Sequence, residues 1–450
     1  MLHSNFPDLW QGAFRGEPGV AEDYWRNVRD HPSVAGRDVR NALALGLRGD
    51  SAPFCKTQSL HTIAWNSLHG LGDTLRTRLV FTSVVKSTCV PGTLATLHRY
   101  LAWAMNALEG GQWPALDWQG KRHPRSGEVL AAGWRGMCVQ VRGDWEFYAD
   151  VFRFPRWNNA ENMCWVCRAS SAIPALAWTA RDGEWRDTYR THESYLAELA
   201  AAGREPCELF LIRTLRLEGV MIDVLHTVDL GVTAHLLGNT CYEIMMSWDV
   251  TQGTAVTRLN ERLRSWYREQ RFADARVQGK LTIERIKTSG GWPKLKAKGA
   301  AIRHLIAFAK DLAVEADDRS LHGQRRMGCL TCMQRFYSIL AEEDRFLTDA
   351  AKTELPQVAY TFMGLYGALS AEAFDSGRRM WKLVPKFHLF QHLCEKQALE
   401  LGNPKFYWTY GDEDMQQHMA SIAQSCHLSN LAPVALHKWA ILVFCREHGR

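Results

Sequence analysis

The sequence lacks the features of a membrane or secreted protein. Its uninterrupted apolar runs all fall short of the roughly 18 residues that a membrane-spanning helix needs. Residues 1–7 carry neither the basic stretch nor the apolar stretch of a secretory signal. The 12 cysteines follow no regular spacing, which argues against a disulfide framework and for free thiols in a reducing compartment. We therefore expect an intracellular protein with no membrane partner.

Internal repeats, low-complexity tracts and obvious flexible linkers are also missing. Hydrophobic residues make up 46% and charged residues 23% of the chain, as in soluble globular proteins. A chain of 450 residues holds two or three domains, or one domain with a large insertion. The net charge of +6 is compatible with nucleic acid as a partner but does not require it, because many soluble enzymes carry as much.

Two apolar segments of the sequence each end in the tripeptide Arg-Gly-Asp. The run 43–49 alternates leucine with smaller residues and ends at Asp50, and the run 137–143 ends at Asp144. If both runs are strands and lie side by side, their carboxylates together bind a divalent cation that neither would bind alone. The alternative is that both aspartates are polar turn residues that follow strands.

The predicted elements around these aspartates follow the order strand, strand, strand, helix, strand. This order resembles the ribonuclease H-like fold of polynucleotidyl transferases, in which the first and fourth strands are neighbours. We therefore predict an α/β fold with a mixed sheet core. A large, mainly helical insertion is expected between Asp144 and a third acidic residue late in the chain. The predicted strands are 43–50, 59–68, 78–90 and 136–144, with a helix over 93–109.

Apolar residues recur at helical spacing through most of the second half of the chain. The predicted helices are 21–30, 191–202, 235–248, 255–271, 300–314, 325–341, 355–370, a helix that begins at Pro385, 415–426 and 431–446. The segment 209–222 fits either a strand or a buried helix. The predicted division of the chain is 1–40 as an N-terminal helical segment, 41–160 as the sheet core, 161–384 as the Cys-x-x-Cys element with the helical insertion, and 385–450 as C-terminal helices that complete the core.

Cys164 and Cys167 have the Cys-x-x-Cys spacing of a zinc knuckle, in which two thiolates supply half of a tetrahedral site. The remaining ligands have to come from elsewhere in the chain. The candidates are His226, or His388 and His392, which lie four residues apart on one helix face. We favour structural zinc, with a pair of buried thiols and satisfied core histidines as the alternative. A second Cys-x-x-Cys at 329–332 lies within a helical pattern and is expected to be packed thiols.

A basic segment with an interspersed tryptophan lies at 280–303. Lysines around an exposed tryptophan suit phosphate contact combined with base stacking. A solvated loop and helix face is an equally good interpretation of the same charges. The candidate nucleic-acid contacts in this segment are Lys287, Trp292, Lys294, Lys296 and Lys298.

Several short motifs occur in an order that resembles the catalytic region of eukaryotic cut-and-paste DDE transposases, nearest to the CACTA/Mirage/Chapaev superfamily. The resemblance extends over roughly 43–427. Its motifs are Gly49-Asp50-Ser51-Ala52-Pro53-Phe54, Asp144 followed by Cys164 and Cys167, Asp223-Val224-Leu225-His226, Pro385-Lys386-Phe387-His388 with His392 and Leu393, and Tyr410-Gly411-Asp412-Glu413.

The resemblance implies a DNA recombinase that cleaves and joins phosphodiesters at transposon ends. It assigns Asp50, Asp144 and Glu413 as ligands of two Mg²⁺ or Mn²⁺ ions. The run 412–414 leaves Asp412, Glu413 and Asp414 as candidates for the third acid, and Asp223 also fits a helix cap. The same resemblance implies DNA as partner, a homodimer, a nuclear location and no nucleotide cofactor.

Two rival functions remain open at this point. The first is a domesticated or inactive relative that binds DNA without cutting it, which would fit the lack of a separate DNA-binding module before the first strand. The second is a nuclease of the same fold that does not transfer strands.

Overall fold

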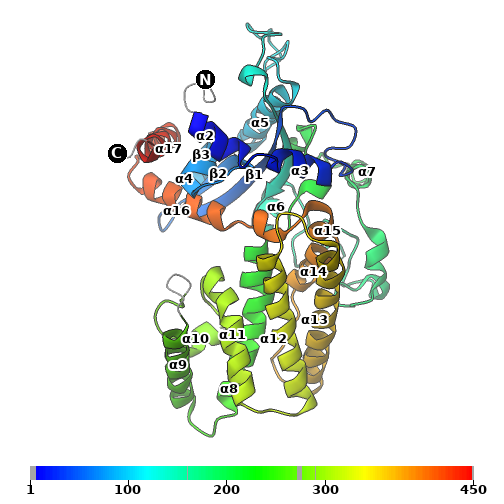
Figure 1. Cartoon of the computed structure of the whole chain (residues 1–450), viewed down its shortest axis with the longest axis vertical. Helices are drawn as coiled ribbons and strands as arrows, with labels where there is room; N and C mark the ends of the chain where they lie inside the picture. The colour runs from blue at the N-terminus through cyan, green and yellow to red at the C-terminus, as the bar shows by residue number, and fades with distance from the viewer. Residues whose placement is uncertain (1–6, 160, 271–275, 289, 448–450) are drawn as a thin grey trace.

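A four-stranded mixed sheet forms one end of the molecule and long helices form the other (Figure 1). The computed structural model describes residues 7–159, 161–270, 276–288 and 290–447. Residues 1–6 of the predicted N-terminal segment and residue 271, the predicted end of one helix, lie outside the described residues. The mixture of sheet and helices confirms the predicted α/β class.

The sheet has the strand order β3-β2-β1-β4. β1 pairs antiparallel with β2, β2 pairs antiparallel with β3, and β1 pairs parallel with β4. The two strands that precede the Arg-Gly-Asp aspartates are therefore hydrogen-bonded neighbours, as predicted. The strands are β1 (Ala42–Pro53), β2 (Ser59–Ser67), β3 (Leu79–Val85) and β4 (Arg135–Arg142).

Helices from both ends of the chain cover the sheet. α5 (Thr93–Gly110) contacts β4, while α16 (Tyr410–Gln424) contacts β1 and α17 (Leu431–Glu447) contacts β3. Because β1 is central and covered, its first eight residues are all buried, and its sequence is a near-continuous apolar run. A hydrophobic cluster separate from the main core joins the sheet to α16 and α17; its members include Leu60, Val85, Met415, Met419 and Trp439.

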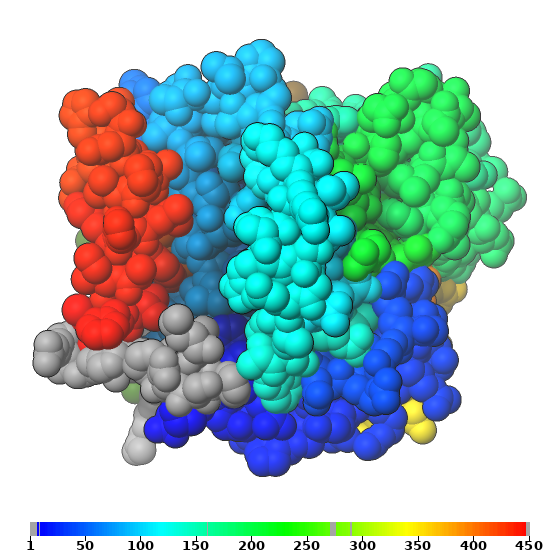
Figure 2. Space-filling model, turned by 90° about the horizontal axis from the view of Figure 1, so that it is seen from above, coloured from blue at the N-terminus to red at the C-terminus, as the bar shows by residue number. Residues whose placement is uncertain are grey.

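Residues 111–134 stand out from the sheet end of the molecule and occupy the centre of the view in Figure 2 (cyan). Two isolated antiparallel bridges, Gln112 to Val129 and Leu116 to Arg122, hold this segment in a hairpin-like shape. The remaining elements of the sheet end are short. They are α2 (Pro7–Trp10), η1 (Gln11–Arg15), α3 (Val20–Asn27), α4 (Thr74–Thr77) and α6 (Trp145–Val151).

The helical part follows the Cys-x-x-Cys loop and α7 (His192–Ala201). Its helices are η8 (Leu225–Thr233, a π-helix), α8 (Ala234–Met246), α9 (Gln252–Glu269), α10 (Ile283–Ile286), α11 (Gly299–Glu315), α12 (Leu321–Glu342), α13 (Asp349–Asp375), α14 (Pro385–His392), η9 (Leu393–Gln397) and α15 (Ala398–Leu401). In the chain these elements lie between β4 and α16.

α14 packs inside the helical part. The ring of Phe390 lies 5.2 Å from that of Phe336 on α12, and the ring of Phe387 stacks on Phe362 of α13 with centroids 6.1 Å apart. α16 and α17, by contrast, pack on the sheet. The described part of the predicted segment 385–450, residues 385–447, is therefore shared between the two ends of the molecule.

The predicted helices and strands are confirmed in type, but some of their ends differ: β3 ends at Val85 and not at 90, α13 begins at Asp349 and not at 355, and α16 begins at Tyr410 and not at 415. The segment 209–222 is neither a regular strand nor a helix. It forms two short 3₁₀ turns, and Val220 makes a single parallel bridge to Val141 of β4. This bridge places the following residues, Ile222 and Asp223, beside the end of β4.

One helix, over Leu428–Arg446, is long and apolar enough to cross a membrane by length and composition. A single segment of this kind is weak evidence for a membrane span. This one buries Leu431, Ala435 and Trp439 in the cluster against the sheet.

Candidate functional site

The two Arg-Gly-Asp tripeptides lie next to each other in the sheet. Arg48 of β1 is paired in register with Arg142 of β4. Asp144 follows the end of β4, whereas Asp50 lies within β1, which continues to Pro53 beyond its pairing with β4. The ring of Phe147 packs against both intervening glycines, Gly49 and Gly143, at positions where a Cβ atom would collide with it. Glycine before each aspartate is thus required by the packing of α6 on the strand ends.

The buried side chain of Arg48 joins two of the predicted catalytic residues. Its Nη2 donates to Oδ2 of Asp50 at 2.7 Å and to Oε1 of Glu413 at 2.8 Å. Its Nη1 donates to the backbone carbonyl of Asp412. Arg48 is only 2% exposed, so its charge is neutralised by these carboxylates rather than by water. The first strand and α16 therefore meet at one guanidinium group.

The three acidic residues at the start of α16 have different environments. Asp412 is 0% exposed, and its oxygens accept from Nε of Arg78 at 2.6 Å and Nε of Arg142 at 3.0 Å. Burial alone would raise the pKa of Asp412, but the guanidinium groups around it hold the pKa far below its usual range. Asp414 faces solvent beside His418. Glu413 is the acid of this run that points toward Asp50.

A second pair, Asp223 and His226, lies beside Glu413. Oδ2 of Asp223 accepts from both Nδ1 and the backbone N–H of His226, at 2.7 and 2.8 Å, and also from the hydroxyl of Thr409. Nε2 of His226 is 3.6 Å from Oε1 of Glu413. Asp223 thus caps the helix that follows it, as the sequence indicated, and also fixes the ring of His226.

The protonation of this group reflects its burial and its charges. Burial acts to lower the pKa of His226, but the hydrogen bond and charge of Asp223, together with Glu413 and Asp144, raise it above its usual value. Burial raises the pKa of Glu413, with Asp50 adding to this and Arg48 opposing it. Negative charge is concentrated here, and Arg48, His226 and Lys386 oppose it.

Asp144 lies at this edge of the sheet but turns its side chain to α6. Its Oδ1 accepts from the backbone N–H of Phe147 at 2.7 Å, as an N-cap. Its charge reaches His226 and Lys386, since it acts on the pKa of both. Among the described residues, the carboxylates of Asp50, Asp144 and Glu413 do not form a group compact enough to surround one ion. The structure brings Asp50 and Glu413 together on Arg48, while Asp144 caps α6.

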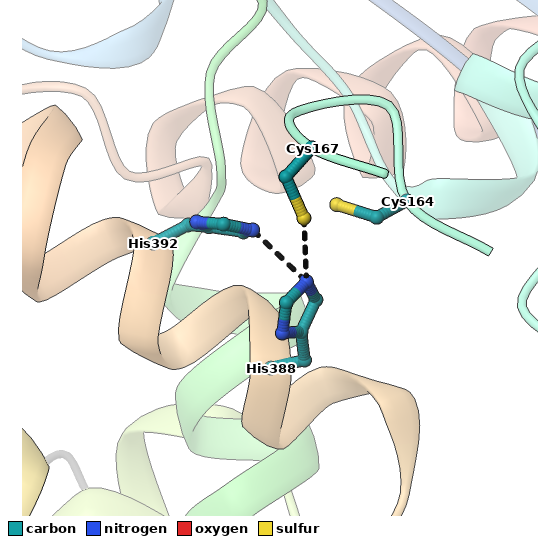
Figure 3. A group of neighbouring side chains, drawn as sticks. All are labelled: Cys164, Cys167, His388 and His392. Atoms are coloured by element: carbon teal, nitrogen blue, oxygen red, sulfur yellow. Dashed lines mark hydrogen bonds between the residues drawn. The ribbon is translucent and has the colours of Figure 1, made fainter. Parts of the chain in front are cut away.

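The two cysteines of the knuckle meet two histidines of α14 (Figure 3). Figure 3 shows Cys164 and Cys167 on one loop pointing at His388 and His392 on the helix. One ligand atom from each of the four residues lies within 4.8 Å of the others. Sγ of Cys167 is 3.2 Å from Nε2 of His388, which is 2.9 Å from Nε2 of His392. All four side chains are fully buried.

The loop around this cluster has the hydrogen bonds of a metal knuckle. Sγ of Cys164 accepts from the N–H of Val166, and Sγ of Cys167 accepts from the N–H of Ala169, each at 3.3 Å. Arg190 donates to the carbonyls of both cysteines. These bonds fix the thiols before any ligand is present, which suits a tetrahedral site with two sulfur and two nitrogen donors.

His226, the other predicted partner of the cysteines, lies elsewhere. Its ring is bound to Asp223 and faces Glu413, so it belongs to the acidic group and not to the cysteine site. The prediction of His226 as a ligand in this cluster was wrong. Two histidines on one helix turn meet the loop because α14 lies against it, whereas η8 directs His226 to the end of β4.

The predicted nucleic-acid residues separate into three groups. Lys287 is half-buried, donates to the hydroxyl of Tyr242 at 3.1 Å and lies over its ring. Lys296 and Lys298 are exposed. Trp292 and Lys294 line a cavity of about 720 Å³ that also borders Asp144, Asp223 and His226.

Sequence reasoning did not identify the arginines that organise the site. Arg48 and Arg142 each come at the end of a buried apolar strand, where a charged residue needs a partner. An arginine that follows a buried apolar run was therefore the feature of the sequence that indicated a buried ion pair. The buried Asp412 gave no comparable signal, because it stands in a run of three acids.

Comparison with known proteins adds no relative. Neither the scan of protein-family models nor the search of curated proteins finds a match to this chain.

Proposed function

We propose that this protein is a metal-dependent DNA recombinase of the DDE transposase kind, built on a ribonuclease H-like core with a helical insertion between Asp144 and Glu413. The observation that carries the proposal is the meeting of Asp50 and Glu413 on Arg48. These two acids are far apart in the sequence, and their residue types and order are those that the family resemblance assigns to catalysis. The parallel pairing of β1 with β4 supports the place of Asp144 at the same edge.

The residues that would hold Mg²⁺ or Mn²⁺ are Asp50, Asp144 and Glu413, because these cations prefer carboxylate oxygens. When bound, such ions activate the attacking water or 3′-hydroxyl and stabilise the leaving oxygen. The chain itself orients the ligands. Arg48 fixes Asp50 and Glu413, and the buried ion pairs of Asp412 hold the start of α16 against the sheet. Asp223 and Thr409 hold the ring of His226 beside them.

DNA is the proposed substrate and partner. Lys294 and Lys386 line the same cavity as Asp144 and Asp223. The homodimer and the nuclear location implied by the resemblance are part of the same proposal.

The proposed zinc site consists of Cys164, Cys167, His388 and His392. The donor set, its full burial and the N–H to sulfur bonds support zinc with a structural role. Such a site would join the loop after α6 to α14, and so connect the sheet end to the helical part.

A nicking assay tests the proposed activity. Supercoiled plasmid and hairpin oligonucleotides are incubated with the purified chain and Mn²⁺. We expect nicked and strand-transfer products, and a loss of about a hundredfold or more in rate for Asp144→Asn, since removal of a metal ligand costs several kcal/mol of transition-state stabilisation. Asp414→Asn is the matched control and should cleave like the parent. Cleavage by Asp144→Asn at the parent rate would overturn the assignment. Cleavage without strand transfer would identify a nuclease of the same fold.

A second candidate function is DNA binding without cleavage. It is favoured by the two interactions that occupy the acids: the guanidinium of Arg48 between Asp50 and Glu413, and the N-cap role of Asp144. A protein that shifts DNA in a gel but leaves plasmid and hairpin intact with Mn²⁺ would support this candidate.

A further inference from the structure

The cavity beside the acidic group has a wall rich in tryptophan. Its volume is about 720 Å³, and it borders Asp144, Asp223 and His226 on one side. This volume is in the range of pockets that enclose a small organic molecule. A DNA duplex is far too wide to enter it, whereas a single nucleotide is not. Five of the 18 tryptophans of the chain line it: Trp145, Trp157, Trp165, Trp178 and Trp292.

The five tryptophans form two groups. Trp145 and Trp165 pack on the protein core, and the rings of Trp157, Trp178 and Trp292, here called the rim, are partly or mostly exposed. Trp145 and Trp165 pack edge to face at 5.4 Å, and Nε1 of Trp145 donates to the carbonyl of Pro155, so these two belong to the protein core. Trp157 is 60% exposed, and Trp178 and Trp292 are half-buried. Flat, partly wet aromatic faces suit the stacking of a nucleobase, which is worth more than burial of an aliphatic group of similar size.

Three lysines supply positive charge to the wall of this cavity. Lys294, Lys382 and Lys386 all line the cavity, and none of them forms an ion pair within 4.0 Å among the described residues. All three lysines lie close enough to His235 to act on its pKa. Burial lowers the pKa of His235, and the three ammonium groups lower it further, to about 3. Lys382 also lies over the ring of Trp292, 5.5 Å from its centroid. Nζ of Lys386 donates to the backbone carbonyl of His226 at 2.6 Å, whereas Lys294 and Lys382 lie beside the aromatic wall without a carboxylate within 4.0 Å among the described residues. Ammonium groups next to aromatic rings fit a phosphate beside a stacked base.

We propose that this cavity binds one unstacked nucleotide of a DNA strand, with its base against Trp178 or Trp292 and its phosphates on Lys294, Lys382 and Lys386. This inference rests on the proposed function, since it places an unpaired nucleotide next to Asp144, one of the three acids that would hold the metal ions. The nucleotide would be supplied by a DNA end or a distorted site, where unstacking costs little.

The test measures DNA binding in the full chain carrying Asp50→Asn, with Ca²⁺ in place of Mg²⁺ so that no strand is cut. One fluorescent 30-base-pair duplex has flush ends, and a second carries a short unpaired overhang with 2-aminopurine. We expect the overhang duplex to bind at least about tenfold more tightly, and its 2-aminopurine emission to be quenched by stacking. Trp292→Ala and Trp178→Ala should each weaken overhang binding about five- to a hundredfold. Lys294→Ala should reduce the salt dependence of binding by about one ion.

One control variant and one further cavity variant complete the test. Trp118→Ala removes a tryptophan from the segment 111–134, outside the cavity, and should bind both duplexes like the parent. Trp157→Ala changes a rim residue that is mostly exposed, so it tests the cavity even if a half-buried tryptophan is needed for folding. Equal affinity of the parent for the two duplexes, or normal overhang binding by all three cavity variants, would overturn the inference. Equally tight binding of free 2-aminopurine deoxynucleotide would assign the cavity to a mononucleotide and overturn the DNA assignment.

The test of nucleotide binding in the cavity and the test of DNA cleavage can give different results. Nicking of plasmid with no preference for the overhang would leave the recombinase proposal standing and remove this inference. Tryptophan-dependent binding of the overhang without any nicking would support the cavity and remove the proposed cleavage.

Discussion

Nε of Arg142, at the end of β4, lies 3.0 Å from Oδ2 of Asp412, at the start of α16, and neither residue is more than 2% exposed. This ion pair connects the strand that precedes Asp144 with the helix that carries Glu413. Arg78 completes it with a second guanidinium at 2.6 Å. The position of Glu413 relative to the strand ends is thus set by an interaction in which Glu413 takes no part.

Breaking this pair should destabilise the fold. Arg142→Met leaves Asp412 buried with Arg78 as its remaining close partner, and loss of one member of a buried pair costs about 3–5 kcal/mol. We expect a reduction of this size in the free energy of unfolding, measured with urea at pH 7. Arg26→Met, which removes an exposed pair with Asp23, should leave the unfolding curve unchanged. An Arg142→Met protein as stable as the parent would show that the pair does not hold α16.

The glycines before the two aspartates should not tolerate a side chain. A Cβ atom on Gly49 would overlap the ring of Phe147, and overpacking of this kind costs about 1–3 kcal/mol. We expect Gly49→Ala to lower the melting temperature and Phe147→Leu to restore part of the loss in the double variant. Gly253→Ala on α9, where a Cβ meets nothing within 4 Å, should be neutral or slightly stabilising. Additive effects of Gly49→Ala and Phe147→Leu would contradict the proposed contact.

The cysteine–histidine cluster predicts one zinc ion per chain. Mass spectrometry of the purified protein should find stoichiometric zinc, and Cys164→Ser and His388→Ala should each abolish it and lower the melting temperature. Cys332→Ser is the matched control, because Cys329 and Cys332 have the same spacing on helix α12 and are expected to bind no metal. Zinc-free protein that is folded and stable would exclude a structural zinc site.

A histidine in the helical part predicts a pH dependence of stability. His322 lies between Glu243 at 3.0 Å and Glu372 at 2.8 Å, and the hydrogen bond and charge of Glu243, with those of Glu372, raise its pKa above the usual value of about 6.5. A group whose pKa is raised on folding stabilises the protein below its unfolded-state pKa. This contribution is lost as the pH rises through the folded-state pKa.

The comparison of parent and His322→Gln over pH 5.5 to 9 tests this prediction. The parent should be the more stable protein near pH 6, and its advantage in unfolding free energy should shrink as the pH rises. The exposed His437 provides the control for loss of an imidazole at the surface, in the variant His437→Gln. An advantage of the parent that grows with rising pH would contradict the prediction.

The sequence predicted the strands and long helices well, because each has a clear apolar period. β1 and β4 were identified as neighbours from the repeated Arg-Gly-Asp ending and the order of elements. His388 and His392 were recognised as a pair because four residues make about one helical turn. These are local properties, and they do not depend on how α14 or α16 packs on the rest of the chain.

Other features of the site depend on packing and were not predicted. Successive residues on a helix point about 100° apart, so only the rotation of α16 against the sheet decides that Asp412 is buried and Glu413 faces Asp50. The choice between His226 and the α14 histidines likewise required the three-dimensional positions of η8 and α14. The tryptophans of the cavity come from separate segments, and of these only Trp292 was identified from the sequence, through the lysines around it.

Binding of Mn²⁺ to the full chain, followed by electron paramagnetic resonance, tests most directly whether Asp50, Asp144 and Glu413 share a metal site. We expect the parent to bind Mn²⁺, Asp50→Asn and Glu413→Gln to lose at least one ion per chain, and Asp414→Asn to bind like the parent. Identical Mn²⁺ binding by the parent, Asp50→Asn and Glu413→Gln would show that these carboxylates hold no metal and would contradict the proposed active site.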